Sequence, residues 1–180
     1  MTKTKKKMNV SLKSLIVLLS ICLVVAVLMA AINAVTAPKI EEANQKAEQD
    51  ALSAVLPNAT EFEKIEGDYP ETVTALYRDK GGAGYAAMLS AKGYDSANPM
   101  TVAVGFDAEG KILSVKVVSA NGETSGIGTK VTGESFLSQF VGKDASFDGV
   151  DTISGATISS SAFLNAVRDA SDAVAKEVAS

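Results

Sequence analysis

Hydrophobic residues dominate one long stretch near the start of the chain. No charged residue occurs from Ser14 to Pro38, and the segment from Leu15 to Ala31 is almost entirely aliphatic. A helix needs about 20 residues to cross the apolar core of a bilayer, so this stretch is long enough to span one. The pattern predicts a transmembrane helix over residues 14–37.

A second helical pattern follows directly after the apolar stretch. Between Pro38 and Pro57, small or apolar residues recur every three or four positions, with acidic and basic residues between them. These positions are Ile40, Ala43, Ala47, Ala51 and Val55. We assign residues 38–58 to a juxtamembrane amphipathic helix that continues the anchor and packs on the following domain. A helix lying on the membrane surface would be richer in lysine.

The middle of the chain alternates between apolar and polar residues, as strands do. In one run Val73, Ala75 and Tyr77 fall on one face, and in another Val102, Val104 and Phe106 do. The predicted strands span residues 72–78, 84–90, 100–106 and 111–119, and a hairpin turn at residues 107–110 joins the last two. We expect a small antiparallel sheet with one buried face and one face open to water.

Two helical patterns complete the chain. Residues 133–142 predict a short helix, and a longer one follows residue 158, with an apolar stripe that is typical of core packing. The stripe comprises Phe163, Ala166, Val167, Ala170, Val174 and Val178. The predicted fold class is therefore α+β, with a single N-terminal transmembrane helix followed by a small antiparallel sheet with flanking helices.

Charge is distributed unevenly along the chain. Five lysines lie within residues 1–13, whereas no acidic residue precedes Glu41. Without these five, 12 of the 17 basic residues remain against 21 acidic ones, which gives the rest of the chain a net charge of −9. Lysines beside a membrane span favour the cytoplasmic side. We expect a basic cytoplasmic head at residues 1–13, a single-pass protein of the cytoplasmic (inner) membrane and an extracytoplasmic domain at residues 59–180.

Other interpretations of the apolar stretch fit the sequence less well. A cleaved signal peptide has a shorter apolar region, of about 7–15 residues. Lipidation at Cys22 would need a small residue before it, but Ile21 stands there. A pilin-like helix would carry a Gly processing site followed by a Glu, and neither is present. The anchor is the favoured interpretation.

The composition restricts the possible chemistry. The chain has no histidine and no tryptophan, and its single cysteine lies in the apolar stretch. Zinc, haem and iron–sulfur ligation and Ser-His-Asp or Cys-His catalysis are therefore excluded as functions of this chain. We expect no resident metal and no nucleic-acid partner. Any redox function requires an organic cofactor.

Small residues precede the last helix. Asp151, Ser154, Gly155, Ala156 and Thr157 form a turn that leads into a helix start, where backbone N–H groups have no internal partners and suit an anion. Gly155 and Ala156 leave room for a phosphate-bearing ligand, and any of the serines at 159–161 is a candidate N-cap. The pattern predicts a phosphate site beside the Thr157 hydroxyl. The alternative is an ordinary loop with a serine-rich cap and no ligand.

A glycine-rich loop at residues 121–130 is the second candidate site. Gly126 and Gly128 lie among hydroxyl residues, and Lys130 offers a cation. Such a backbone is able to close on a planar or phosphorylated ligand, although a plain glycine-rich linker has the same composition. We interpret Gly93 and Tyr94, upstream, as a structural turn rather than a ligand contact.

Both loops resemble one family. Asp151-x-x-Ser154-Gly155-Ala156-Thr157 is similar to the flavinylation motif of the FMN-binding domain that the G subunit of the Rnf electron-transport complex shares with the C subunit of the sodium-pumping NADH:quinone reductase. The segment from Glu123 to Gly128 resembles that family's Glu-Thr-Pro-Gly-Leu-Gly loop, with Ser125 and Ile127 as the departures. Gly93-Tyr94 is similar to the family's lead-in to its central sheet.

The resemblance implies a cofactor and a set of site residues. FMN would be covalent, through a phosphoester to Thr157, and attached by a separate FAD-dependent flavin transferase. The loop around Gly128 would lie against the flavin, and no residue would be catalytic. The implied cofactor-binding residues are Thr157, Ser154, Gly155, Ala156, Asp151, Glu123, Thr124, Gly126, Gly128 and Lys130.

The resemblance also implies a function. The chain would be an electron carrier, not catalytic alone, in a membrane complex that couples ferredoxin:NAD⁺ electron transfer to Na⁺ or H⁺ translocation. Its partners would be the other subunits of that complex. Two alternatives stay open: a covalent-FMN domain of another extracytoplasmic electron-transfer system, and a non-redox membrane-anchored binding module.

Overall fold

The structure, a computed structural model, describes residues 10–144 and 146–179, with side chains in the first helix from Leu12 onward. The predicted basic head at residues 1–13 therefore lies largely outside the described residues. The chain divides into two compact units, the first ending at Gln45 and the second beginning at Lys46. The site candidates all fall in the second unit.

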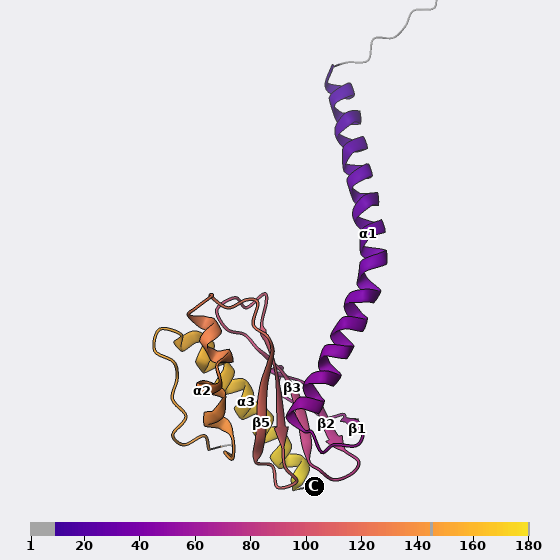
Figure 1. The fold of residues 1–180 in the computed structure, drawn as a ribbon. Coiled ribbons are helices and arrows are strands. Elements are labelled where there is room, and N and C mark those ends of the chain that lie inside the picture. Colours follow the sequence, from indigo (N-terminus) through magenta and orange to yellow (C-terminus); the bar gives the residue numbers. More distant parts are fainter. Residues whose placement is uncertain (1–9, 145, 180) are drawn as a thin grey trace, which may run out of the picture. The chain divides into compact units, whose positions relative to one another are not determined.

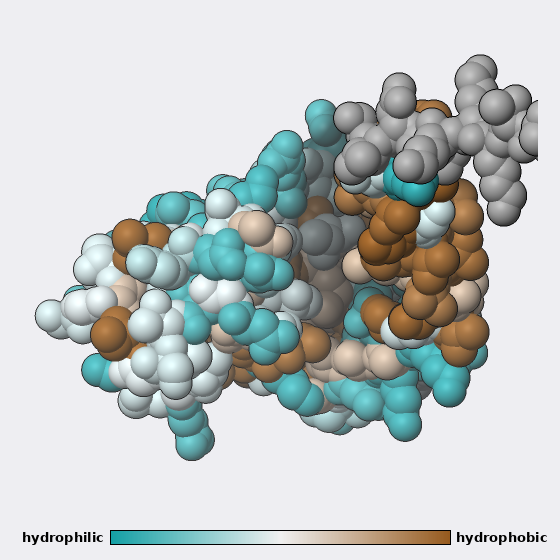
Figure 2. Space-filling view, turned by 90° about the horizontal axis from the view of Figure 1, so that it is seen from above, coloured by the Kyte–Doolittle hydropathy of each residue, from teal (hydrophilic) through white to brown (hydrophobic). Residues whose placement is uncertain are grey.

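Helix α1 runs without interruption from Val10 to Val55 and includes Pro38. Its apolar side chains between Leu12 and Ile40 are exposed, and it is the one helix of the described residues that is long and apolar enough to cross a membrane. These side chains form the brown surface of α1, whereas teal and white residues dominate the surface of the second unit (Figure 2). The residues predicted to cross the membrane thus form an apolar helix, as part of a longer one.

Five strands form one antiparallel meander, in the order β1-β2-β3-β4-β5 (Figure 1). Their bounds are Phe62–Ile65, Val73–Asp79, Tyr85–Ala91, Met100–Phe106 and Ile112–Ser119. The four predicted strands and the α+β class are confirmed. Strand β1 was missed because its four residues contain only two apolar positions, too few for a recognisable alternation.

One face of the sheet packs against the C-terminal helices. Helix α3 spans Thr157–Val178, and the predicted stripe on it is buried except for Val178. Helix α2, Glu134–Leu137, and the 3₁₀ turns Gly128–Thr132 and Ser138–Phe140 complete this layer. Phe136, Phe140 and Phe163 lie edge-on or tilted to one another, with ring centroids 5.3–5.4 Å apart. This aromatic cluster joins the short helix to α3.

The prediction that the other face of the sheet is open to water was wrong. Ala75, Ala86, Met88 and Ala103 on that face pack against the end of α1, through Ala51, Leu52 and Val55. A Cβ atom at Gly105 would lie 2.1 Å from the Val55 carbonyl oxygen, so glycine allows the helix to approach the sheet. Of the predicted amphipathic stripe, only Ala51 and Val55 are buried.

Strand β2 also departs from the predicted pattern. A register shift lies between Val73 and Ala75, so Val73 packs in the core under α3 whereas Ala75 and Tyr77 pack on the face toward α1. A bulge adds one residue to a strand and thereby moves the following side chains to the opposite face. The three residues therefore do not share one face, as the alternation had indicated.

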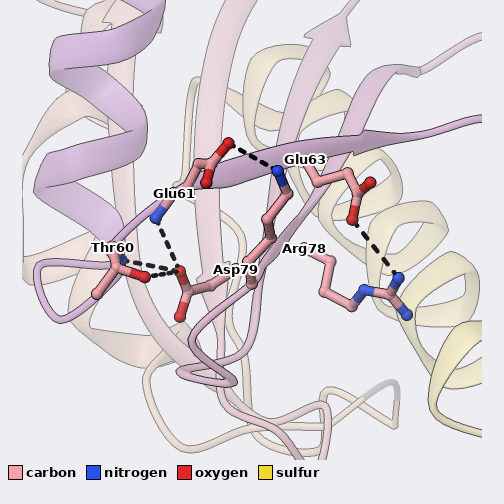
Figure 3. A network of polar contacts seen from close by, with 6 residues as sticks. Thr60, Glu61, Glu63, Arg78 and Asp79 are labelled. Atoms are coloured by element: carbon pink, nitrogen blue, oxygen red, sulfur yellow. Dashed lines mark hydrogen bonds and ion pairs between the residues drawn. The ribbon is translucent and has the colours of Figure 1, made fainter.

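A buried carboxylate ties the segment after α1 to the sheet (Figure 3). Asp79, only 2% exposed, accepts hydrogen bonds from the backbone N–H groups of Ala83 at 2.9 Å, Thr60 at 2.8 Å and Glu61 at 3.1 Å. Two exposed ion pairs beside it contribute little stability: Lys80–Glu61 and Arg78–Glu63. The N–H groups, that of Ala83 foremost, hold the pKa of Asp79 well below its usual range.

We predict that Asp79→Asn lowers the unfolding temperature of the second unit by several degrees at neutral pH. A carboxyl whose pKa is depressed on folding stabilises the fold above its unfolded pKa of about 3.9 and loses this contribution as the pH falls through the folded value. The gap between wild type and variant should therefore shrink below about pH 4, as measured by circular dichroism melting.

Asp95→Asn is the matched control for this experiment. Asp95 also accepts hydrogen bonds, but only from Ala97 and Asn98 within its own turn. It should cost less stability than Asp79→Asn. The prediction would be contradicted if Asp79→Asn lowered the unfolding temperature equally at every pH, or if Asp95→Asn lowered it as much.

Candidate functional site

A tight turn precedes α3. Ala156 donates its backbone N–H to the Ile153 carbonyl at 2.9 Å, and Gly155 adopts a φ of 81°, a conformation that favours glycine. The Ser160 hydroxyl accepts the Ile153 N–H at 3.2 Å and donates to the Ala156 carbonyl at 2.9 Å. The side chain of Ser160 thus fastens the turn to the first turn of the helix.

The predicted N-cap was wrong. Helix α3 begins at Thr157, its N-cap is Ala156, and no side chain among the described residues caps it. The serine hydroxyls are engaged elsewhere, because Ser160 bonds to the turn and Ser159 bonds to Glu123. The first N–H groups of α3 therefore remain available, and with the helix dipole they favour an anion beside Thr157.

The glycine-rich loop closes on itself by backbone hydrogen bonds. The Thr124 carbonyl accepts N–H groups from Ile127 at 3.1 Å and from Thr129 at 3.2 Å. Gly126, with a φ of 74°, donates its N–H to the Thr129 hydroxyl at 2.9 Å. These bonds fix the loop although Ser125 lacks the restricted φ of proline.

Glu123 connects this loop to two other segments. Its side chain is buried, one carboxylate oxygen accepts the Tyr94 N–H at 3.1 Å, and the other accepts the Ser159 hydroxyl proton. A Cβ at Gly93 would lie 1.9 Å from the first oxygen, and one at Gly128 would lie 2.5 Å from the second. The two glycines therefore make room for the carboxylate, which points into the protein.

A cavity of about 380 Å³ opens where these segments meet. This volume lies within the range of small-molecule sites. Three of its apolar side chains are strongly exposed: Tyr94 at 69%, Ile127 at 48% and Ile158 at 61%. The remaining lining residues are Thr124, Gly128, Gly155, Ala156, Thr157 and Ser159. Exposed apolar groups around a concave site suit a flat, largely apolar ligand.

The structure brings together only part of the predicted set. Thr124, Gly128, Gly155, Ala156 and Thr157 line the cavity, and the Thr157 side chain is exposed. Five predicted residues do not line it: Asp151, Ser154, Glu123, Gly126 and Lys130. Asp151 is exposed in the loop before the turn, and Ser154 is exposed within the turn. Glu123 lies behind the lining, and Lys130 borders a neighbouring cavity of about 360 Å³.

Sequence reasoning missed four residues that line the cavity: Tyr94, Ile127, Ile158 and Ser159. Ile127 lies inside the predicted glycine-rich loop. Ile158 and Ser159 follow the motif directly, and the start of α3 at Thr157 places both beside the cavity. Tyr94 had been interpreted as structural, yet its ring is exposed at the cavity while its N–H bonds to Glu123. No local pattern distinguishes such a tyrosine from an ordinary turn residue.

Metal binding gains no support from the side chains. Within residues 10–144 and 146–179, no group of three or more Cys, Asp or Glu side chains is arranged to hold a metal ion. The chemistry available at the cavity is therefore that of backbone N–H groups, hydroxyls and apolar surface.

Comparisons with known proteins identify the two parts of the chain. Residues 93–172 match the FMN-binding domain, and residues 1–55 match the RnfG N-terminal region. The cavity and its surrounding loops lie within the first match. The two matches together cover most of the chain.

Three curated relatives, each the G subunit of an oxidoreductase complex, are similar over nearly their whole length. The G subunit of the proton-translocating ferredoxin:NAD⁺ oxidoreductase complex of Clostridium ljungdahlii is 27% identical, over 85% of this chain and 85% of the relative. The G subunit of the Na⁺-translocating ferredoxin:NAD⁺ oxidoreductase complex of Acetobacterium woodii is 29% identical, over 92% of this chain and 94% of the relative. The G subunit of the ion-translocating oxidoreductase complex of Methanosarcina acetivorans is 26% identical, over 92% of this chain and 95% of the relative.

We predict that Ser160→Ala lowers the free energy of unfolding by about 1–2 kcal/mol, because the Ile153 N–H loses its acceptor. Ser171→Ala is the matched control: Ser171 is also buried on α3, but its hydroxyl bonds only to the Val167 carbonyl of the same helix. It should cost less than about 0.5 kcal/mol. Chemical denaturation of the full chain in detergent measures both, and equal losses would contradict the role of Ser160.

Proposed function

Because this chain belongs to the RnfG family, in which the RnfG N-terminal region precedes an FMN-binding domain, we propose that it is the electron-carrying subunit of an ion-translocating ferredoxin:NAD⁺ oxidoreductase complex. It acts as a carrier and does not catalyse the overall reaction alone. Its partners are the other subunits of that complex. Na⁺ and H⁺ are the candidate ions, since one relative belongs to a complex named for proton translocation and another to a complex named for Na⁺ translocation.

The fit of the cavity to FMN supports this proposal. Tyr94, Ile127 and Ile158 offer apolar surface for a flat ring system. The uncapped start of α3 offers N–H groups for a phosphate. Bound FMN supplies one- and two-electron transfer, and the chain binds and orients it.

The position of Thr157 carries the proposal of a covalent bond. It is the first residue of α3, its side chain is exposed, and it lines the cavity beside the uncapped N–H groups. A hydroxyl there lies where an anion is stabilised, so a phosphoester to Thr157 would place its charge at the helix start. Ser154, Gly155 and Ala156 present this residue in an open turn.

Thr157 depends on a separate enzyme for its activation. A threonine hydroxyl is a weak nucleophile without a base, and the chain contains no histidine. We infer that a flavin transferase using FAD supplies the base. The Thr157 oxygen then bonds to the phosphorus of the FMN half of FAD, the bond from that phosphorus to AMP breaks, and the hydroxyl proton passes to the transferase base.

The proposed location explains why a covalent bond is useful. With the lysine-rich end in the cytoplasm and α1 across the membrane, the second unit faces the extracytoplasmic side. A dissociated FMN would be lost there, whereas a phosphoester holds it at the site. The carrier is then permanently available to its partner subunits.

We predict that Thr157→Val abolishes the flavin adduct of the native chain. Wild type purified from its host should give a fluorescent band in a denaturing gel, and the tryptic peptide 144–168 should carry FMN at Thr157. Thr157→Ser should retain some adduct, because it keeps a hydroxyl at the same position. Thr152→Val is the control, since this exposed threonine lies in the same peptide. A fluorescent Thr157→Val chain would refute the assignment.

We also predict the membrane orientation. Alkaline phosphatase is active only after export, so its fusion to the C-terminus of the full chain should show activity in intact cells. Deleting residues 14–37 from the same fusion should abolish that activity, because the apolar span is lost. A fluorescent protein that requires the cytoplasm to mature can be fused at the same C-terminal position. If this fusion is fluorescent and the phosphatase fusion is inactive, the proposed orientation is reversed.

A further inference from the structure

The Glu123 side chain bonds to two segments that line the cavity. Its carboxylate accepts the N–H of Tyr94, whose exposed ring borders one side. It also accepts the hydroxyl proton of Ser159, which lies in the first turn of α3 two residues after Thr157. Glu123 itself begins the loop that contributes Thr124, Ile127 and Gly128 to the lining. Three segments distant in sequence thus meet at one carboxylate.

The environment leaves this carboxylate little freedom. It is 8% exposed, and the ion pairs of the described residues involve other acidic side chains, namely Glu61, Glu63 and Glu71. Its charge is therefore met by the Tyr94 N–H and the Ser159 hydroxyl, and a buried acceptor that loses a donor carries a large penalty. Gly93 and Gly128 enclose it so closely that a Cβ at either position would collide with it. The position of Glu123 therefore fixes those of Tyr94 and Ser159.

We propose that Glu123 is a positioning residue for flavin attachment. By holding the Tyr94 segment to the first turn of α3, it keeps the cavity formed before FMN arrives, so that Thr157 reaches the transferase in one arrangement. This inference rests on the proposed function, and adds that the acceptor site is preformed by a buried carboxylate that does not touch the ligand.

A preformed acceptor has a specific kinetic consequence. When only a fraction of the molecules has the competent arrangement, the apparent affinity falls by that fraction, while the step after binding is unchanged. Loss of the Glu123 contacts should therefore raise the apparent KM of the transferase for this chain and leave kcat nearly constant. A group that takes part in the transfer would instead change kcat.

The test measures flavin attachment to the full chain in detergent, with purified transferase, FAD and Mg²⁺, over a range of chain concentrations. Glu123→Ala should raise the apparent KM at least about tenfold, because it removes both hydrogen bonds to the carboxylate. Ser159→Ala should raise it about threefold or more, because one contact remains. Ser171→Ala, which removes a buried hydroxyl elsewhere on α3, should leave KM unchanged.

Glu123→Gln separates geometry from charge. The amide oxygen accepts the Tyr94 N–H, and the amide nitrogen donates to the Ser159 oxygen, so both contacts persist. This variant should remain within about threefold of wild type, since only the charge is lost. Hydrogen exchange of the Tyr94 amide gives a second readout: it should accelerate in Glu123→Ala and remain slow in Glu123→Gln.

The outcomes decide between the two proposals. If wild type acquires no FMN at Thr157, the proposed function fails and this inference with it. If wild type is loaded normally but Glu123→Ala and Ser159→Ala keep its KM, only the positioning role fails. If Glu123→Gln is as impaired as Glu123→Ala, charge rather than geometry matters and positioning is overturned. Should Glu123→Ala not fold, an unchanged KM for Ser159→Ala overturns it.

Discussion

The packing of α3 on the sheet is the constraint on which the second unit depends. The buried stripe of α3 fills the core against β2, β3 and β4, and Phe163 joins it to the aromatic cluster of α2 and the following turn. The same helix begins at Thr157, so the hydrophobic contacts that stabilise the fold also fix the location of the candidate site. A shift of α3 along the sheet would move its uncapped start away from the Glu123 loop. Core and site therefore share one element.

Polar contacts refine what this packing determines. Ser160 fastens the turn before α3, and Glu123 connects the loop, the Tyr94 segment and the helix start. Each buried carboxylate or hydroxyl at the site has a hydrogen-bond partner, and the described residues contain no buried side-chain nitrogen or oxygen without one. The cavity is thus bordered by exposed apolar groups on the outside and by satisfied polar groups behind them.

Much of the fold followed from the sequence, because alternation and helical periodicity are local properties. The strands at Met100–Phe106 and Ile112–Ser119 and the stripe on α3 could be read directly. The burial of the second sheet face could not be predicted, because its alanines are buried only where the end of α1 covers them. The prediction of the N-cap failed because the hydroxyls of Ser159 and Ser160 form hydrogen bonds with Glu123 and Ile153, which a local pattern does not reveal. The motif located Thr157, whereas the contribution of Tyr94 to the cavity depends on the folded chain.

The position of Thr157 at the start of α3 has a consequence for biogenesis. The cavity is complete only after α3 has been synthesised and has docked on the sheet. A molecule truncated within α3, or arrested before that helix docks, lacks a wall of the acceptor site. Under the proposed function, cofactor insertion therefore follows the docking of α3, and a molecule that carries flavin is one in which this helix has docked.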